Sequence, residues 1–424
     1  MKRTVLFLLV LSSLSFAQNT TFLTNKFNKL CNEKQFFSLN RELIKSKDML
    51  NDMQRLYFGA ILDNAFNRPE SSNKSIRELF SGFKDQLTDS MAARLLECRI
   101  SNSVNLFDYK DAAAATDSLI DRYDYLYEKD FKDELVNSGL IWKAASDLQP
   151  QEMTVTADTR IDVKKDIAAL SNIGVNINGS SEQFIFDTGA NFSTVSESYA
   201  SKLRLSFLKG NIKVGTSTGI KVESRLAYTK SMIIGNMKFN NVLFLVLPDE
   251  ALSFGGGVYV INGIIGFPVI KEMKEIQLTE NELFVPMNSK SKSVLNLSFD
   301  GFTPLVETVV NSDTLVFVFD TGAKKTMIYH PYYEMHKEEI DKNYSPEEIR
   351  IGGAGGEIKV KGFKLDNIIF KVASSSIKLD DVSLISVNVK KSEEYTFGNL
   401  GSDFTGSFRV MIIDFANMSL EFSD

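Results

Sequence analysis

The feature that most constrains this chain is a heptapeptide that occurs twice. Phe184–Ala190 reads Phe-Ile-Phe-Asp-Thr-Gly-Ala, and Phe317–Ala323 repeats six of its seven residues at an offset of 133. Asn178 and Asn311 precede the two copies at that same offset. Asn178-Gly179 between apolar runs is typical of a two-residue hairpin turn. We therefore expect two homologous units in tandem, each containing a hairpin whose second strand ends in Asp-Thr-Gly.

Two weaker matches extend the repeat along the chain. Met237–Val246 resembles Phe363–Val372, and Gly263–Gly266 resembles Gly398–Gly401, in the same order in both halves. Short runs of Val, Ile and Phe broken by Asn, Gly and Ser predict an all-β region after Pro150. The predicted units are residues 151–287 and 300–424, and the polar residues 288–299 form the predicted linker.

The preceding residues, 18–150, have a different pattern. Apolar residues recur at helical spacing, as in Leu39, Leu43, Leu50 and Met53, and Arg68–Ser72 looks like a turn followed by a new helix start. Further helices are expected near residues 90–104 and 109–125. The pattern predicts antiparallel helical hairpins that loosely resemble tetratricopeptide arrays, although no clean 34-residue period emerges. A bundle that only packs on its neighbour, a removable pro-domain and a domain that binds a protein partner all remain open.

Composition restricts the chemistry. The 424 residues suffice for two or three domains, and they include only two histidines, His330 and His336, and two cysteines, Cys31 and Cys98. This excludes most multi-histidine zinc sites and every cysteine-rich framework. The two cysteines either form one disulfide or stay as buried thiols. A net charge of -6 is a poor match for nucleic acid or anionic lipid. Carboxylates or hydroxyls must therefore carry any catalysis.

The first seventeen residues resemble a secretory signal. Lys2 and Arg3 precede the mostly apolar Val5–Phe16, and Ala17 completes a small-residue cleavage pattern. No cysteine follows the cut, so no lipid anchor is indicated, and the apolar run is too short for a membrane span. We expect removal of residues 1–17 and a periplasmic or secreted protein without a stable membrane span.

Paired Asp-Thr-Gly segments suit one particular chemistry. A buried strand delivers the aspartate at its end, and glycine permits the tight turn that exposes the carboxylate. If two such turns meet about a two-fold axis, Asp187 and Asp320 lie side by side and share one proton. One carboxyl is then a base and the other an acid, so the pair activates water for peptide hydrolysis without a metal or cofactor.

At these residues the chain resembles the retropepsin-like aspartic proteases. In that family an Asp-Thr-Gly-Ala turn is followed by a glycine-rich flap and then by a segment of two apolar residues and glycine. Both halves of residues 155–424 contain all three elements, with Asn399 in place of the first apolar residue in the second half. The resemblance implies an α+β protein, with a helical hairpin domain before a bilobal all-β retropepsin- or pepsin-like domain. Both aspartates come from one chain, so the catalytic unit is expected to be a monomeric internal dimer.

The resemblance also implies roles for individual residues. Asp187 and Asp320 are the expected catalytic pair, and the substrate is an extended peptide or unfolded protein. The residues expected to support the two active-site turns are Thr188, Gly189, Ala190, Thr321, Gly322 and Ala323. The expected flaps that cover substrate are Gly215, Thr216, Ser217, Thr218 and Gly219 in the first unit, and Gly352, Gly353, Ala354, Gly355 and Gly356 in the second. Neither flap contains the tyrosine found in pepsins.

Three alternative interpretations were weighed. Gly215–Gly219 matches the Gly-x-Ser-x-Gly elbow of serine hydrolases, but the residues from Lys221 onward are not an apolar helix start. Gly352–Gly356 lacks the Lys-Ser/Thr and helix of a phosphate loop. His330 and His336 are expected on the surface after the second motif. The remaining alternative is a catalytically inactive peptide-binding or scaffold module. Both aspartates and both motif glycines are intact, which argues against it, because an enzyme that had lost activity would tend to lose at least one of them.

Overall fold

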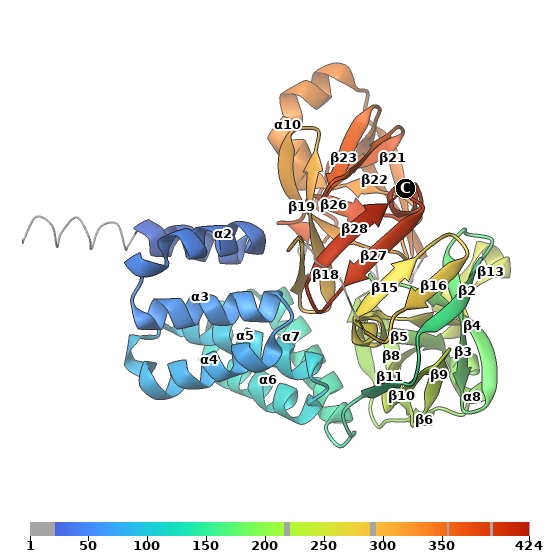
Figure 1. The fold of residues 1–424 in the computed structure, drawn as a ribbon, viewed down its shortest axis with the longest axis horizontal. Coiled ribbons are helices and arrows are strands. Elements are labelled where there is room, and N and C mark those ends of the chain that lie inside the picture. Colours follow the sequence, from blue (N-terminus) through green and yellow to red (C-terminus); the bar gives the residue numbers. More distant parts are fainter. Residues whose placement is uncertain (1–21, 216–220, 289–293, 354–355, 391–392, 424) are drawn as a thin grey trace, which may run out of the picture.

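The computed structural model describes residues 22–215, 221–288, 294–353, 356–390 and 393–423. A helical region comes first and a mostly β region follows, so the α+β prediction is confirmed. The helices of this first region lie together on one side of the β region, which divides into an upper and a lower part in Figure 1. The predicted signal peptide lies outside the described residues. No helix in the described ranges combines the length and the apolar character that crossing a membrane requires.

The helical region is a series of hairpins. Residues 22–32 are helical, and the elements that follow are α2 (Phe36–Ser46), α3 (Asp52–Ala65), α4 (Pro69–Gly82), α5 (Asp89–Asn105), α6 (Tyr109–Tyr123) and α7 (Lys129–Ala145). The helices predicted near 90–104 and 109–125 are confirmed, whereas α4 begins at Pro69, inside the residues 68–72 that were predicted as a turn before a helix. Asn51 forms a capping box with Gln54, and Asp108 caps α6, which explains where those helices begin.

The connections of these helices alternate between two forms. Lys34, Asn67 and Phe107 have positive φ angles of 55°, 55° and 58° and end the first helix of each successive pair. Short 3-10 turns follow α2, α4 and α6. Helices of each pair pack through small residues such as Ala60, whose carbonyl accepts a hydrogen bond from the buried Ser72 hydroxyl at 2.7 Å.

The first β unit contains the following elements: β1 (Glu152–Val155), β2 (Thr159–Lys165), β3 (Ser171–Ile177), β4 (Ser180–Phe186), β5 (Ser193–Ser196), α8 (Glu197–Lys202), β6 (Ser206–Phe207), β7 (Ile212–Gly215), β8 (Lys221–Thr229), β9 (Met232–Ile234), β10 (Met237–Asn240), β11 (Val242–Leu247), β12 (Ser253–Phe254), β13 (Tyr259–Val260), β14 (Gly263–Ile265), α9 (Phe267–Ile270), β15 (Glu275–Leu278) and β16 (Glu282–Val285).

The second unit contains β17 (Leu297–Asp300), β18 (Thr303–Val310), β19 (Asp313–Phe319), β20 (Met327–Ile328), α10 (His330–Asn343), β21 (Glu347–Gly353), β22 (Gly356–Leu365), β23 (Ile368–Val372), β24 (Ser375–Leu379), β25 (Val382–Ile385), β26 (Gly398–Leu400), α11 (Ser402–Thr405), β27 (Val410–Asp414) and β28 (Ser419–Ser423). Phenylalanine fills the interior of both units. Among its fully buried side chains are Phe184, Phe186, Phe317 and Phe319, which lie on the strands that lead to the two aspartates.

Both predicted hairpins are present. β3 and β4 pair with Ile177 opposite Ser180, and the two loop residues Asn178 and Gly179 have φ angles of 50° and 86°. This is the left-handed geometry that Asn-Gly adopts at low cost. β18 and β19 pair in the same way, and Asn311 between them has a φ of 53°.

The second sequence match of the repeat was wrong in its register. β9 pairs with β3 and β10, and β23 pairs with β18 and β24. β11 runs parallel to β5, and β25 runs parallel to β20. Met237–Val246 therefore corresponds to β24 and β25, not to Phe363–Val372. The confusion has a physical origin, because Asn241 and Asn367 both occupy left-handed turns before an apolar strand. The structural counterpart of Asn241 is Asp381, with a φ of 55°.

A continuous sheet joins the two units. β15 pairs with β27 antiparallel, from Glu275 opposite Asp414 to Leu278 opposite Met411. The Asn296 side chain exchanges hydrogen bonds with the backbone of Leu420, at 2.8 and 2.9 Å, and so ties the start of the second unit to β28. β17 begins at Leu297, so the last residues of the predicted linker 288–299 form a strand that pairs with β18.

Candidate active site

Each aspartate stands at the end of a strand that is fixed from both sides. β4 pairs parallel with β14, and the amide of Asp187 donates to the carbonyl of Ile265 at 3.1 Å. β19 pairs parallel with β26, and the amide of Asp320 donates to Leu400 at 3.2 Å. Strands β14 and β26 contain the Gly263–Gly266 and Gly398–Gly401 matches, whose pairing is thus the same in the two units.

The turn after each aspartate holds its carboxyl group. Oδ1 of Asp187 accepts the backbone N–H groups of Gly189 at 2.8 Å and Ala190 at 3.2 Å. Oδ1 of Asp320 accepts those of Gly322 at 2.9 Å and Ala323 at 3.0 Å. One oxygen of each carboxyl is thereby occupied by the protein, while Oδ2 receives no bond from the turn.

The two turns are cross-braced by the motif threonines, both of which are buried. The backbone N–H of Thr188 donates to Oγ1 of Thr321 at 3.0 Å, and that of Thr321 donates to Oγ1 of Thr188 at 3.0 Å. The Thr188 hydroxyl donates to the carbonyl of Phe319, and the Thr321 hydroxyl donates to that of Phe186, at 3.1 and 2.9 Å. The four bonds form a nearly symmetric set across the junction of the two units.

The motif glycines permit the carboxyl groups to approach. A Cβ atom at Gly322 would lie 2.3 Å from Cγ of Asp187, and one at Gly189 would lie 2.6 Å from Cγ of Asp320. Each carboxyl therefore packs directly against the glycine of the other turn. The two carboxyl groups are therefore close enough for each to influence the pKa of the other.

Burial and proximity change the acidity of the pair. Burial, followed by the charge of Asp320, raises the pKa of Asp187 well above its ordinary value of 3.8, against the lowering effect of the Gly189 and Ala190 amides. Burial also raises the pKa of Asp320, although its backbone amides and the charge of Lys390 act in the opposite direction. Two adjacent buried carboxyls cannot both ionise cheaply, so one proton is shared between them.

Two supporting hydroxyls were missed by the sequence analysis. Ser193 accepts the backbone N–H of Gly266 at 3.1 Å, and Thr326 accepts that of Gly401 at 3.1 Å. Both bonds link the segment that follows an aspartate to the end of its partner strand. Each hydroxyl lies six residues after its aspartate, so Ser193 and Thr326 are separated by the same 133 residues as the two motifs. This shared offset could have identified them from the sequence.

The predicted flap residues are only partly described. Gly215 ends β7, whose partner β8 starts at Lys221, so Thr216, Ser217, Thr218 and Gly219 lie outside the described residues. Gly352 and Gly353 end β21, and Gly356 opens β22 in a long antiparallel hairpin, whereas Ala354 and Gly355 lie outside the described residues.

The two histidines belong to helix α10 in the second unit. His336 contacts the carboxylate of Asp313 at 3.0 Å, and His330 lies 3.8 Å from Glu334. They lie after the second motif, as expected, but their side chains are only partly exposed, at 23% for His330 and 25% for His336. Pro331 lies in the first turn of the helix, where its missing N–H costs no helical hydrogen bond. In the described part of the chain, no group of three or more His, Cys, Asp and Glu residues could hold a metal ion.

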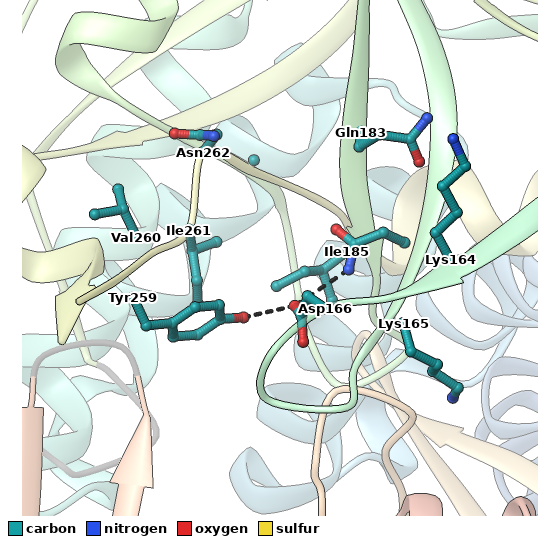
Figure 2. Close-up of a pocket in the computed structure, with 11 residues that line it drawn as sticks. Lys164, Lys165, Asp166, Gln183, Ile185, Tyr259, Val260, Ile261 and Asn262 are labelled. Atoms are coloured by element: carbon teal, nitrogen blue, oxygen red, sulfur yellow. Dashed lines mark hydrogen bonds between the residues drawn. The ribbon is translucent and has the colours of Figure 1, made fainter. Parts of the chain in front are cut away.

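A pocket of about 260 Å³ lies beside the first turn (Figure 2). Its wall includes Ile185, two residues before Asp187, and residues of that spacing on a strand point to the same face. The opposite wall is the segment Tyr259–Gly263 that leads into β14. The Tyr259 hydroxyl donates to Oδ2 of Asp166 at 2.8 Å and closes one side of the pocket. The lining combines polar and apolar residues and includes Lys164 and Lys165 at the end of β2.

Comparison with known proteins agrees with this geometry. The family model for aspartyl protease matches residues 173–269, which run from β3 to the segment after β14 and include Asp187. No curated protein matches the chain. The matched segment contains the hairpin, the first Asp-Thr-Gly turn and the paired strand that fixes it. The chain therefore carries an aspartyl protease-like domain.

Proposed function

We propose that this protein is an aspartic endopeptidase in which Asp187 and Asp320 form the catalytic pair. The observation that carries the proposal is the placement of the two carboxyls against each other's turns, with both pKa values raised by burial. Perturbed titratable pairs of this kind cluster at functional sites. Because both carboxyls come from one chain, the catalytic unit needs no second copy.

The chemistry follows from the shared proton. The ionised carboxyl takes a proton from a water bound between the two groups, and the water oxygen forms a bond to the carbonyl carbon of the scissile amide. The protonated carboxyl hydrogen-bonds the carbonyl oxygen as negative charge develops there. When the C–N bond breaks, the departing nitrogen receives a proton from the carboxyl that took it from water. The products are a new carboxylate and a new amine, and the pair returns to its singly protonated state.

The surroundings suit an extended peptide. In this proposal the hairpins β7–β8 and β21–β22 lie over the substrate, whose backbone is held by strand-like hydrogen bonds. The pocket in Figure 2 receives one substrate side chain. Its wall includes Asp166, Lys164 and Gln183, which can form hydrogen bonds with a polar substrate side chain.

Cellular placement and domain roles complete the proposal. The basic start, apolar run and Ala17 of the sequence support export to the periplasm or outside the cell, with residues 1–17 removed. N-terminal sequencing of the exported protein tests this cut. The alternating connections of α2 to α7 support a tetratricopeptide-like ancestry for residues 18–150. We further propose that the β units act as two lobes of one catalytic domain.

The test of the activity is a digest without an assumed specificity. The chain from Gln18 and its Asp187→Asn variant are incubated with a diverse peptide mixture from acidic to neutral pH, and new termini are read by mass spectrometry. Cuts that only the unmodified protein makes support the proposal. If neither protein cuts while the unmodified chain still binds peptides, the inactive peptide-binding alternative is correct.

A further inference from the structure

One side chain of the helical region forms hydrogen bonds with the backbone of the first β unit, as a neighbouring strand would. Asn137 of α7 contacts the backbone of Lys213, the second residue of β7. The Lys213 N–H donates to Oδ1 of Asn137 at 2.9 Å, and Nδ2 of Asn137 donates to the Lys213 carbonyl. β7 pairs with β8 on its other side, so the asparagine amide occupies the open edge of this strand.

Apolar side chains of α7 also contact the buried face of β7. Ile212 of β7 is buried in one hydrophobic cluster with Ile141 and Trp142 of α7, and the neighbouring Val214 packs against that cluster. Strand β7 is therefore fixed to the helical region through its backbone edge and through its buried face. Its position relative to the rest of the first unit depends on helix α7.

The same helix also contacts the segment that follows the first aspartate. Trp142 stacks on Tyr109 of α6 on one side, with ring centroids 6.0 Å apart, and meets Phe192 on the other, also at 6.0 Å. Phe192 lies five residues after Asp187, and its carbonyl accepts the hydroxyl of Thr194 at 3.1 Å. One helix thus touches both the β7–β8 hairpin and the active-site loop.

A buried lysine strengthens this junction. Lys271, just after α9, is only 7% exposed, and its Nζ donates to the carbonyl of Asn105 in α5 at 2.9 Å. The same ammonium lies 4.7 Å from the ring centroid of Phe107 and pairs with Glu272 at 2.5 Å. The helical region and the first β unit thus share a buried, hydrogen-bonded lysine as well as an apolar cluster.

We infer that helix α7 positions the β7–β8 hairpin and that Asn137 is a positioning residue for substrate binding. This inference rests on the proposed peptidase function. The asparagine touches neither substrate nor the aspartates; it fixes the strand from which the hairpin extends. The helical region is then a working part of the enzyme, and peptide affinity depends on it.

The variant that tests this is Asn137→Ala in the full exported chain. Gln86→Ala is the matched control, because it removes an exposed amide from the turn between α4 and α5. Hydrogen–deuterium exchange of residues 212–215 measures the hydrogen bonds between Asn137 and Lys213, and it does not require catalytic activity. We expect Asn137→Ala to accelerate exchange at Lys213 about three- to tenfold, the effect of one modest hydrogen bond, and Gln86→Ala to leave it unchanged. Asn137→Asp, which keeps the acceptor for the Lys213 N–H, should lie between the two.

Kinetics on a cleaved peptide supply the second readout. We expect KM to rise about three- to tenfold in Asn137→Ala with kcat within twofold of the unmodified enzyme, because the hairpin contributes to binding and not to proton transfer. Unchanged exchange at Lys213 overturns the inference, as does accelerated exchange with an unchanged KM. If no peptide is cleaved by the unmodified protein, the proposed function fails, and peptide affinity then takes the place of KM while the exchange result still decides whether Asn137 holds β7.

Discussion

Thr188 and Thr321 exchange hydrogen bonds in both directions, since the backbone N–H of each donates to the hydroxyl of the other at 3.0 Å. Each hydroxyl then donates to a carbonyl of the opposite unit. The two turns are therefore locked to each other one residue from each aspartate. The separation of the carboxyls is set by these four bonds rather than by the longer connections of the chain.

Removing one threonine hydroxyl should loosen this lock. Thr188→Val leaves the buried N–H of Thr321 and the buried carbonyl of Phe319 without partners, at about 1–3 kcal/mol each. Thr188→Ser keeps the hydroxyl and loses only a methyl group, worth roughly 0.8 kcal/mol. Thermal unfolding of both variants measures the difference. Equal stability of the valine and serine variants would show that the hydroxyl is not a brace.

The glycine after each threonine should tolerate no side chain. Gly322→Ala places a methyl group 2.3 Å from Cγ of Asp187, so the carboxyl must move, at a cost of about 1–3 kcal/mol in stability and with loss of peptide cleavage. Gly59→Ala in α3 is the matched control, because a Cβ there meets nothing within 4 Å. It should stabilise the protein by about 0.5–1 kcal/mol through the helix preference of alanine. An active, fully stable Gly322→Ala protein would contradict the close approach of the turns.

Stability should respond to pH through the aspartate pair. The folded-state pKa of Asp187 lies above the unfolded value near 3.8, so the folded state binds the proton more tightly. That contribution is complete below the unfolded pKa and is lost as pH rises through the folded pKa. The Asp187→Asn variant has no titratable group at this position, so its stability does not fall in this way as pH rises. Its melting temperature should therefore rise relative to the unmodified protein as pH increases above about 4. A difference that stays constant with pH would refute the raised pKa.

The two cysteines give a prediction about the helical region. Cys31 and Cys98 are buried free thiols, and burial raises the pKa of each to about 12. Thiol reagents attack the thiolate, which is scarce at neutral pH under these conditions. The native protein should react with neither thiol, and the denatured protein should expose two per chain without a reducing agent. Finding none after denaturation would reveal a disulfide instead.

The sequence predicted those parts of the site whose geometry is local. The Asn178-Gly179 turn and the strands before the two Asp-Thr-Gly segments depend on residues next to one another, and they lie where expected. The match of Met237–Val246 failed because a left-handed Asn precedes an apolar strand at different places in the two units, Asn241 before β11 and Asn367 before β23. Strand pairing separates the two, and sequence similarity does not.

Contacts between elements far apart in the chain could not be predicted from the sequence. Asn137 is a half-exposed polar residue in an amphipathic helix, and nothing beside it in the sequence indicates a partner 76 residues away. Trp142 is the sole tryptophan of the chain, but its packing on Phe192 depends on how the helical region meets the β region. Such contacts follow from the assembled fold, so only the three-dimensional structure identifies them.

The pH–rate profile of one cleaved peptide tests the central claim most directly. It is measured for the unmodified enzyme, for Asp187→Asn and Asp320→Asn, and for Ser217→Ala, which removes the serine of the competing Gly-x-Ser-x-Gly interpretation. The pair requires one protonated and one ionised carboxyl, so the rate should follow a bell whose basic limb lies above the ordinary carboxyl pKa. Each asparagine variant should lose roughly 10²–10⁴-fold or more in kcat while it stays folded, and Ser217→Ala should match the unmodified enzyme. Substantial cleavage by either folded asparagine variant would contradict the account.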